Sequence, residues 1–343
     1  MKYPDFLKEK GTISLVAPSF GANIEPYHSQ VKKAIKIFKE DSYIINEGPN
    51  VFEGKGIGIS NSSELCAKEL MDAYLDDSDI IISVGGGEMM CSILPHLDFN
   101  LLKDVKPKWF MGFSDNTNFS FTLTTLCNIA TINGHNFNSF SQYPRHKCLS
   151  DSLKLLTGKK DLDDSFIIDG YPKWEKEEAK DHSKGYNLDS DNIYQKYPLN
   201  FNGQIEGRLL VGTLDCLVNL CGTYFDNVKN FIEKYKNDGI VWVFDACELM
   251  PFSIARALWQ LKNAGWFKYT KGFIFGKSYM AYNKTTINLD DHLAIVETLK
   301  DLNVPIIMDF EYGHFEPSMP FINGSYAIFD INDNKTKVKM ILK

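Results

Sequence analysis

The chain has 343 residues, of which 44% are hydrophobic and 24% charged, and this length predicts about two globular domains. The composition excludes a disordered chain and a small scaffold held by disulfides. The 37 basic and 44 acidic side chains give a net charge of −7 without any concentrated basic run, so nucleic acid is not expected as a partner. Neither a long apolar stretch nor the apolar core of a signal peptide is found, so we expect a soluble cytoplasmic protein that does not bind membranes.

The seven cysteines are odd in number, lie mostly in apolar runs and form no CxxC pair. Cys216 and Cys221 lie close in sequence but have no nearby histidine that would complete a zinc site. We therefore expect buried, reduced thiols that behave as small hydrophobic side chains, and no metal site.

Short apolar runs rich in β-branched residues alternate with amphipathic helical patterns along the first half of the chain. This alternation is typical of an α/β fold with a parallel sheet covered by helices. Ligands of such sheets bind at the carboxyl ends of the strands. The expected strands are 12–18, 79–87 and 108–114, and the expected helices are 28–41, 62–77 and 117–127.

The segment 151–203 is polar and charged, and it predicts a connector with one edge strand. We accordingly expect an N-terminal domain over 1–165, a connector over 166–203 and a C-terminal domain over 204–343. In the C-terminal part, an apolar region over 203–225 is followed by strands at 239–246, 271–278 and 304–310, helices at 252–267 and 289–303, and a closing hairpin at 325–343.

The first candidate catalytic motif is W-F-M-G-F-S-D-N-T, in which an apolar strand ends and Ser114 comes just before a helix. A serine on a sharp strand-to-helix turn exposes its Oγ, and the amides that follow lie at the positive end of the helix, where they can stabilise an oxyanion. The alternative is that Ser114 or Asp115 only caps the helix. Asn116 replaces the second glycine of the G-x-S-x-G pattern, which argues against an ordinary α/β-hydrolase.

The second feature is S-V-G-G-G-E, a predicted strand that leads into three glycines. Glycines allow positive φ and a close approach of ligand to backbone, so their amides are candidates for the other half of an oxyanion hole. We expect Gly85, Gly87 and Glu88 to contact the substrate and one glycine of the run to contribute to the oxyanion hole. The run is neither a P-loop nor a dinucleotide-binding fingerprint, and a simple tight turn is the alternative.

The third feature lies in the second half, where Asp245 and Glu248 follow one predicted strand and His314 lies on a loop after another. A histidine on a solvated loop of turn-forming residues is a poor core residue. The remaining histidines are expected at the surface, although His135, which follows a strand-like run, is a weaker candidate for a functional histidine. With Ser114, these residues have the chain order nucleophile, acid, base of a Ser-His-acid triad.

Together these motifs resemble the LD-carboxypeptidase and microcin C immunity family of serine peptidases. The resemblance spans nearly the whole chain and is carried by APSFG, VGGGEMMCSILPHLD, MGFSDNT, IEGRLLVGTLDCLVNLCGT, VWVFDACELMPFSIARALWQLKNAGWF, FIFGK and VPIIMDFEYGHFEP. It implies a flavodoxin-like or amidotransferase-like N-terminal domain, a smaller α/β C-terminal domain, a homodimer, and no metal or organic cofactor. It also implies Ser114 as nucleophile, His314 as base, and an oxyanion hole formed by Gly86 or a neighbouring glycine with the amide of Asp115.

The acid is the position at which the chain departs from the family pattern. The family has a glutamate followed by an aspartate there, and counting back from Ile254 places Asp245 and Ala246 at these two positions. Aspartate is one methylene shorter than glutamate, so either the backbone lies closer to the histidine or Glu248, three residues later, reaches in instead. Asp245 is the expected acid and Glu248 the alternative. A degraded triad, which would leave a non-catalytic ligand-binding homologue, is a third reading.

The substrate that the resemblance implies is a small peptide cleaved at an amide near its terminus, either an LD-peptide of the murein type or a peptidyl-nucleotide conjugate. Leu249 and Tyr279 replace a lysine and a glutamate of the immunity proteins, which argues against nucleotide recognition. Val84 replaces an arginine that is usual in the LD-carboxypeptidases, and at this position the chain resembles the immunity-protein branch more closely. A cysteine-dependent amidotransferase is disfavoured because the strand-to-helix turn carries a serine.

Overall fold

The computed structural model describes residues 1–343, which form two compact units, each with its own sheet. Unit 1 comprises Met1–Lys159, Ala179–Tyr186 and Pro320–Asn323, and unit 2 comprises Lys160–Glu178, Asn187–Met319 and Gly324–Lys343. Neither unit is one continuous stretch of chain. None of the helices combines the length and the apolar character needed to span a bilayer.

Unit 1 is built on a six-stranded sheet with the order β14-β5-β4-β3-β1-β2. The strands are β1 (Thr12–Val16), β2 (Ile44–Glu47), β3 (Ile80–Ser83), β4 (Trp109–Gly112), β5 (Thr131–Asn133) and β14 (Phe321–Asn323). The first five are parallel to their neighbours, and β14 is antiparallel to β5. The order 2-1-3-4-5 is that of flavodoxin-like sheets, which confirms the fold class expected for this part of the chain.

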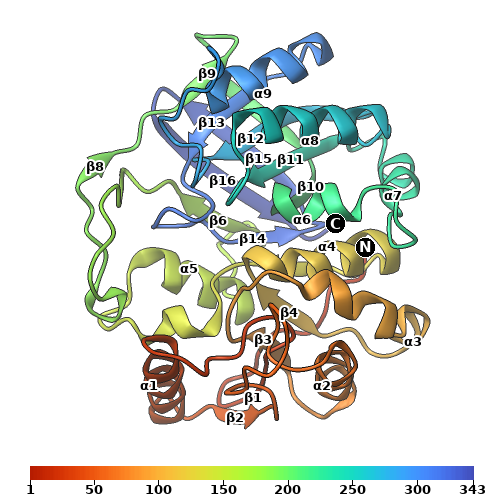
Figure 1. Ribbon diagram of the computed structural model, residues 1–343, viewed down its shortest axis with the longest axis vertical. Helices are drawn as coiled ribbons and strands as arrows, with labels where there is room; N and C mark the ends of the chain where they lie inside the picture. The colour runs from red at the N-terminus through yellow and green to blue at the C-terminus, as the bar shows by residue number, and fades with distance from the viewer. The chain divides into compact units, whose positions relative to one another are not determined.

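Helices cover both faces of this sheet, with α1 and α5 on one side and α2 and α3 on the other (Figure 1). All four residues of β3 are buried, as expected for a parallel strand covered on both faces. The helices are α1 (Tyr27–Glu40), α2 (Ser63–Leu75), α3 (Phe99–Asp104), α4 (Thr117–Cys127) and α5 (Lys147–Leu156), with 3-10 helices η1 (Met90–His96), η2 (Ser114–Asn116), η3 (Phe137–Ser141) and η4 (His182–Lys184).

Unit 2 is built on an eight-stranded sheet with the order β6-β16-β15-β10-β11-β12-β13-β9. Its four central strands, β10 to β13, are parallel, and the flanking strands are antiparallel to their neighbours. The strands are β6 (Phe166–Asp169), β9 (Gln195–Tyr197), β10 (Gly203–Thr213), β11 (Ile240–Asp245), β12 (Thr270–Gly276), β13 (Ile306–Phe310), β15 (Tyr326–Asn332) and β16 (Lys335–Ile341), and β7 (Lys173–Trp174) and β8 (Ser190–Asp191) form a separate ribbon.

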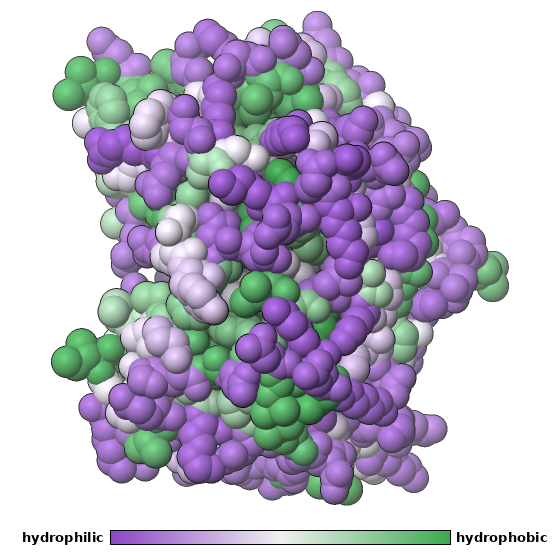
Figure 2. Space-filling model, turned by 90° about the vertical axis from the view of Figure 1, so that its right-hand side faces the viewer, coloured by the Kyte–Doolittle hydropathy of each residue, from purple (hydrophilic) through white to green (hydrophobic).

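The parallel strands of unit 2 are connected by helices, of which α8 and α9 pack side by side (Figure 1). Aromatic rings fill the core beneath them: Trp242 of β11 is stacked on Trp266, with ring centroids 6.0 Å apart. The helices are α6 (Leu214–Leu220), α7 (Val228–Lys234), α8 (Pro251–Asn263), α9 (Asp291–Leu299) and the 3-10 helix η5 (Lys300–Leu302). On the face drawn in Figure 2, hydrophilic residues predominate and the apolar ones form small separate groups.

The segment 151–203 contains more regular structure than the expected connector with one edge strand, so that expectation is wrong. Helix α5 extends to Leu156, and β6 and β9 occupy the two opposite edges of the eight-stranded sheet. These two strands have four and three residues. An edge strand needs a partner on one side only, so three or four residues suffice, and such short segments leave no clear periodicity in the sequence.

Candidate active site

The carboxyl ends of the parallel strands in unit 1 bring three loops to one edge of the sheet. The strand order reverses between β1 and β3, and flavodoxin-like sheets bind ligands at such a switch point, outside the carboxyl ends of the strands. Ser19 follows β1, the three glycines follow β3, and Ser114 follows the neighbouring strand β4. The two N-terminal features identified in the sequence therefore lie at the edge where a ligand is expected.

Ser114 has a left-handed backbone conformation, with φ of +64°, at the junction between β4 and η2. A non-glycine residue in this region carries backbone strain, and such strain is often found at functional sites. The capping residues of η2 and α4 are Phe113 and Asn116, so Ser114 is not a helix cap. The sharp turn predicted from the sequence is present, with Ser114 half-buried at its apex.

Asn116, which replaces the second glycine of the usual serine turn, uses its side chain to join two loops. Its Nδ2 donates to the carbonyl oxygen of Gly85 at 2.8 Å and lies 3.2 Å from Oδ1 of Asn136. The same Oδ1 accepts a hydrogen bond from the backbone N–H of Phe113 at 2.9 Å. These buried bonds connect the turn of Ser114 to the glycine turn.

The glycine turn lies directly against Ser114. A Cβ atom on Gly86 would be 3.1 Å from the Cβ of Ser114, which is closer than nearly all real contacts of this kind. A Cβ on Gly87 would overlap Oγ of Ser19, so only glycine fits there. Glu88 is exposed, and its N–H lies 3.4 Å from the carbonyl oxygen of Gly58. The expected substrate contacts of Gly85, Gly87 and Glu88 stay predictions.

In unit 2, His314 and Asp245 are in direct contact. Nδ1 of His314 lies 2.5 Å from Oδ2 of Asp245, whose side chain is completely buried at the end of β11, while the His314 side chain is 17% exposed. Glu248, the alternative acid, is exposed, and its N–H donates to Oδ1 of Asp215. The carboxylate that orients the imidazole in this structure is therefore Asp245.

The surroundings of His314 favour its protonated form. Burial alone would disfavour the charged ring, but the charge and hydrogen bond of Asp245, with a smaller contribution from Cys247, outweigh it and raise the pKa of His314 to about 10. A carboxylate that stabilises an imidazolium is what a general base needs after it has accepted a proton. Cys247 was expected only as a buried thiol, and no sequence signal placed it beside the histidine.

Gly313 allows the loop of His314 to pass close to Asp245. Its φ is +114°, and a Cβ there would lie 2.8 Å from the Cβ of Asp245. Any other residue would meet both backbone strain and a steric clash. The glycine before the histidine is thus required for the short distance between the imidazole and the carboxylate.

Aromatic side chains of unit 2 lie next to His314. The ring of Tyr279 lies 6.1 Å from the His314 ring and 5.0 Å from Phe315, and Phe315 is also in edge contact with Trp174. The backbone N–H of Tyr279 donates to the carbonyl oxygen of Ala246 at 2.8 Å. That bond joins the loop after β12 to the loop that carries the acid.

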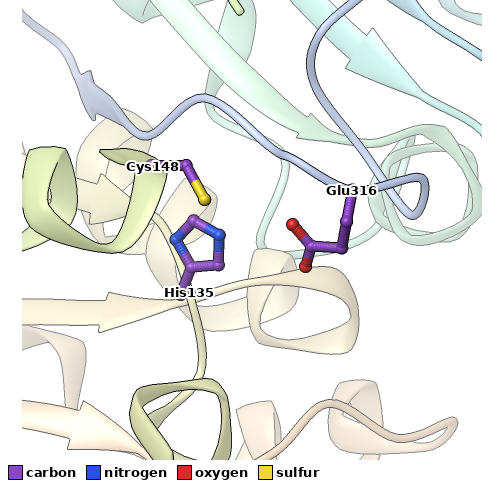
Figure 3. Close-up of side chains that lie close together, drawn as sticks. All are labelled: His135, Cys148 and Glu316. Atoms are coloured by element: carbon purple, nitrogen blue, oxygen red, sulfur yellow. The ribbon is translucent and has the colours of Figure 1, made fainter. Parts of the chain in front are cut away.

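His135 is buried, so the expectation that the remaining histidines lie at the surface is wrong for this residue. It is 5% exposed, and its Nδ1 is 2.8 Å from Oγ of Ser152 on α5. Cys148, also on α5, points toward the same ring (Figure 3), and its sulfur lies within 4.8 Å of a ring nitrogen. His135 follows β5, and this position at a strand end was the only sequence signal for it.

A second histidine–carboxylate pair, which the sequence did not indicate, lies in unit 2. Nε2 of His292 is 3.0 Å from Oδ1 of Asp309, and Asp309 has a φ of +61° at β13. Burial opposes protonation, but Asp309, with Asp291 and Asp290 nearby, raises the pKa of His292 to about 8. His292 was expected to be a surface residue, and it is instead half-buried in an ion pair.

Comparison with known proteins relates both units to one family. The model of the LD-carboxypeptidase N-terminal domain matches residues 13–134, and the model of the LD-carboxypeptidase C-terminal domain matches residues 206–328. A carboxypeptidase homologue from Rickettsia conorii is 26% identical over 79% of this chain and 74% of its own. Another from Vibrio cholerae is 23% identical over 87% of this chain and 88% of its own.

Solved structures share the fold at lower sequence identity. An MccF-like protein from Bacillus anthracis is 22% identical, with a TM-score of 0.81 over all of both chains. The microcin C7 self-immunity protein MccF, solved with aspartyl sulfamoyl adenosine, is 19% identical, with a TM-score of 0.81 over 99% of this chain and 98% of its own. A muramoyltetrapeptide carboxypeptidase from Oxalobacter formigenes is 19% identical, with a TM-score of 0.71 over 96% of this chain and 98% of its own. Because the two family models together match more than half of the residues, this chain belongs to the LD-carboxypeptidase family of peptidases.

Proposed function

We propose that this chain is a serine peptidase that hydrolyses an amide bond near the terminus of a small peptide. Ser114 is the nucleophile, His314 the general base and Asp245 the acid of the triad. The observation that carries the proposal is the bond between Nδ1 of His314 and Oδ2 of the buried Asp245. A strained serine at the strand-to-helix turn and membership of a peptidase family support it.

In the proposed mechanism, Oγ of Ser114 attacks the scissile carbonyl while His314 takes the hydroxyl proton. Asp245 holds the ring in one orientation and stabilises the imidazolium. The tetrahedral oxyanion is stabilised by the amide of Asp115 and that of Gly86 or a neighbouring glycine. His314 then gives its proton to the leaving amine, and water hydrolyses the acyl-enzyme with His314 again as base.

For the substrate, we propose an LD-peptide of the murein type or a peptidyl-nucleotide conjugate. A related fold in a muramoyltetrapeptide carboxypeptidase supports the first, and a related fold in an immunity protein that binds aspartyl sulfamoyl adenosine supports the second. Because the proposed nucleophile lies in unit 1 and the proposed base and acid lie in unit 2, neither unit should be active alone. A homodimer and a cytoplasmic location stay predictions.

A fluorophosphonate probe tests the nucleophile without knowledge of the substrate. We expect the wild-type protein to gain one phosphonyl group on Ser114, located by peptide mass spectrometry, and His314→Ala to lose this labelling. Glu248→Gln is the control and should be labelled at the wild-type rate, because Glu248 is exposed. Absence of labelling in a folded wild-type protein would contradict the proposal and favour a non-catalytic ligand-binding homologue.

A further inference from the structure

We infer that the side chain of Asp115 is a positioning group for the oxyanion hole, because its carboxylate joins the segments that carry the stabilising amides. This inference rests on the proposed function, in which Asp115 contributes only its backbone N–H. It concerns a second role of the same residue, carried by atoms that do not touch the substrate.

The carboxylate of Asp115 accepts hydrogen bonds from three separate segments of unit 1. Oδ2 accepts from Oγ of Ser19 at 2.5 Å and from the backbone N–H of Met90 at 2.8 Å. Oδ1 accepts from Nδ2 of Asn118 at 2.8 Å. The residue is 3% exposed, so these bonds are shielded from water, and charge-assisted hydrogen bonds are about twice as strong as neutral ones. One side chain thus ties the loop after β1, the segment after the glycines and the start of α4.

The Ser19 contact controls the glycine turn through the next residue. The N–H of Phe20 donates to the carbonyl oxygen of Gly86 at 2.7 Å. In a trans peptide the carbonyl and the following N–H point in opposite directions, so this bond directs the N–H of Gly87 away from the loop after β1. The carbonyl of Gly85 is held in the same way by Asn116, which sets the direction of the Gly86 N–H.

Met90 provides the second connection to the same turn. It lies three residues after Gly87 and begins η1, and its N–H is anchored by the carboxylate that directly follows Ser114 in the chain. The glycine turn is therefore fixed on both sides to the residue next to the nucleophile. Loss of these anchors should loosen the amides while leaving Ser114 and its strained turn in place.

The chemistry of the site requires a carboxylate rather than an amide. Both oxygens of Asp115 accept hydrogen bonds, whereas an asparagine at this position has only one accepting oxygen, and its NH₂ group would face a donor. Asp115→Asn conserves the size of the side chain but loses one of its two accepting oxygens, and with it the hydrogen bonds to that oxygen. Ser19→Ala removes only the hydrogen bond from Oγ of Ser19 to Asp115. This is a smaller change, because alanine differs from serine only by the hydroxyl group.

The test is the rate of fluorophosphonate labelling of the full chain, separated into reversible probe affinity and the rate constant of phosphonylation. We expect Ser19→Ala and Asp115→Asn to lower the phosphonylation rate constant by about 10- to 100-fold, with probe affinity changed less than about threefold. If these side chains only stabilised the fold, the substitutions would lower thermal stability without lowering the phosphonylation rate constant more than the probe affinity. Asp98→Asn is the matched control, because Asp98 also accepts two backbone N–H bonds in unit 1 but caps α3.

The outcomes distinguish this inference from the proposed function. If both variants react like the wild type while Ser114→Ala is not labelled, the inference is wrong and the proposed nucleophile stands. If the wild type is not labelled at all, both fail. Should Asp115→Asn not fold, Ser19→Ala alone decides, and a wild-type phosphonylation rate in that variant would overturn the inference.

Discussion

His314 and Asp245 are joined by a hydrogen bond of 2.5 Å between Nδ1 and Oδ2, although they are 69 residues apart in sequence. The aspartate ends a buried strand, and the histidine lies on a loop that reaches it only because Gly313 precedes it. In the proposed mechanism, Nε2 is the ring nitrogen that takes the proton of Ser114. Asp245, Gly313 and His314 therefore form one local cluster, and the contribution of each residue can be tested separately.

Asp245→Asn should lower kcat/KM by about 10³- to 10⁴-fold, because an amide neither stabilises the imidazolium nor holds the required tautomer. The measurement is steady-state hydrolysis by the folded variant, with circular dichroism as the check of folding. Glu248→Gln should stay within about twofold of the wild type. The opposite pattern, with activity lost only in Glu248→Gln, would assign the acid to Glu248.

The raised pKa of His314 predicts how activity depends on pH. A base must be deprotonated to accept a proton, and a pKa of about 10 keeps the ring protonated at neutral pH, so kcat/KM should increase as pH rises from 7 to 9. Titration of the ring protons of His314 by NMR gives the pKa directly, and Asp245→Asn should lower it. A ring that loses its proton below pH 6.5 would contradict this prediction.

Gly313→Ala should lower activity more than a glycine replacement that causes backbone strain alone. The new Cβ would lie 2.8 Å from the Cβ of Asp245 and push the loop of His314 away. Gly222→Ala is the matched control, since Gly222 also has a positive φ, of +81°, but an added Cβ would meet nothing within 4 Å. Both variants should lose about 1 kcal/mol of stability through strain, and only Gly313→Ala should lose more than tenfold in kcat. Equal kcat values in the two variants would refute this role of Gly313.

The pair of His292 and Asp309 should stabilise the fold in a pH-dependent way. In the folded protein the pKa of His292 is about 8, above the ordinary value of 6.5. The stabilisation is therefore complete below pH 6.5 and is lost as pH rises through 8. His292→Gln should reduce the free energy of unfolding by up to about 2 kcal/mol at pH 6 and by little at pH 9, as measured by urea unfolding. His96→Gln, which alters an exposed pair with Glu64, should have little effect at either pH. A difference that is constant with pH would exclude the ion pair as its cause.

The parallel part of the fold was predictable because its signal is local. Runs such as Ile80–Ser83, buried on both faces, alternate with amphipathic helices, and this pattern alone indicates a covered parallel sheet. The closing hairpin was also predictable and is formed by β15 and β16, but the short antiparallel strands β6, β9 and β14 at the sheet edges were not. Strands such as β9 have three residues, and β14 pairs with β5 across nearly 190 residues of sequence, so their position depends on tertiary contacts.

The candidate site was predictable where a residue follows a strand and lies among turn-forming residues, as Ser114 and His314 do. Whether Asp245 or Glu248 contacts the histidine depended on how closely two loops approach each other, and spacing along the chain does not contain that information. The same holds for Ser19 and Cys247. Both lie in segments that carry the family resemblance, but nothing in those segments gives either side chain a role, and each becomes relevant only through a partner far away in the chain.

Hydrolysis by Ser114→Ala compared with the wild type tests the central claim most directly. An LD-tetrapeptide of the murein type and a peptidyl-nucleotide conjugate serve as substrates, and amine release is followed by mass spectrometry. Members of a catalytic triad act as a unit, so the variant should lose at least about 10³-fold in kcat on the substrate that the wild type cleaves, while its thermal stability stays unchanged. A folded Ser114→Ala protein that hydrolyses this substrate at the wild-type rate would contradict the account.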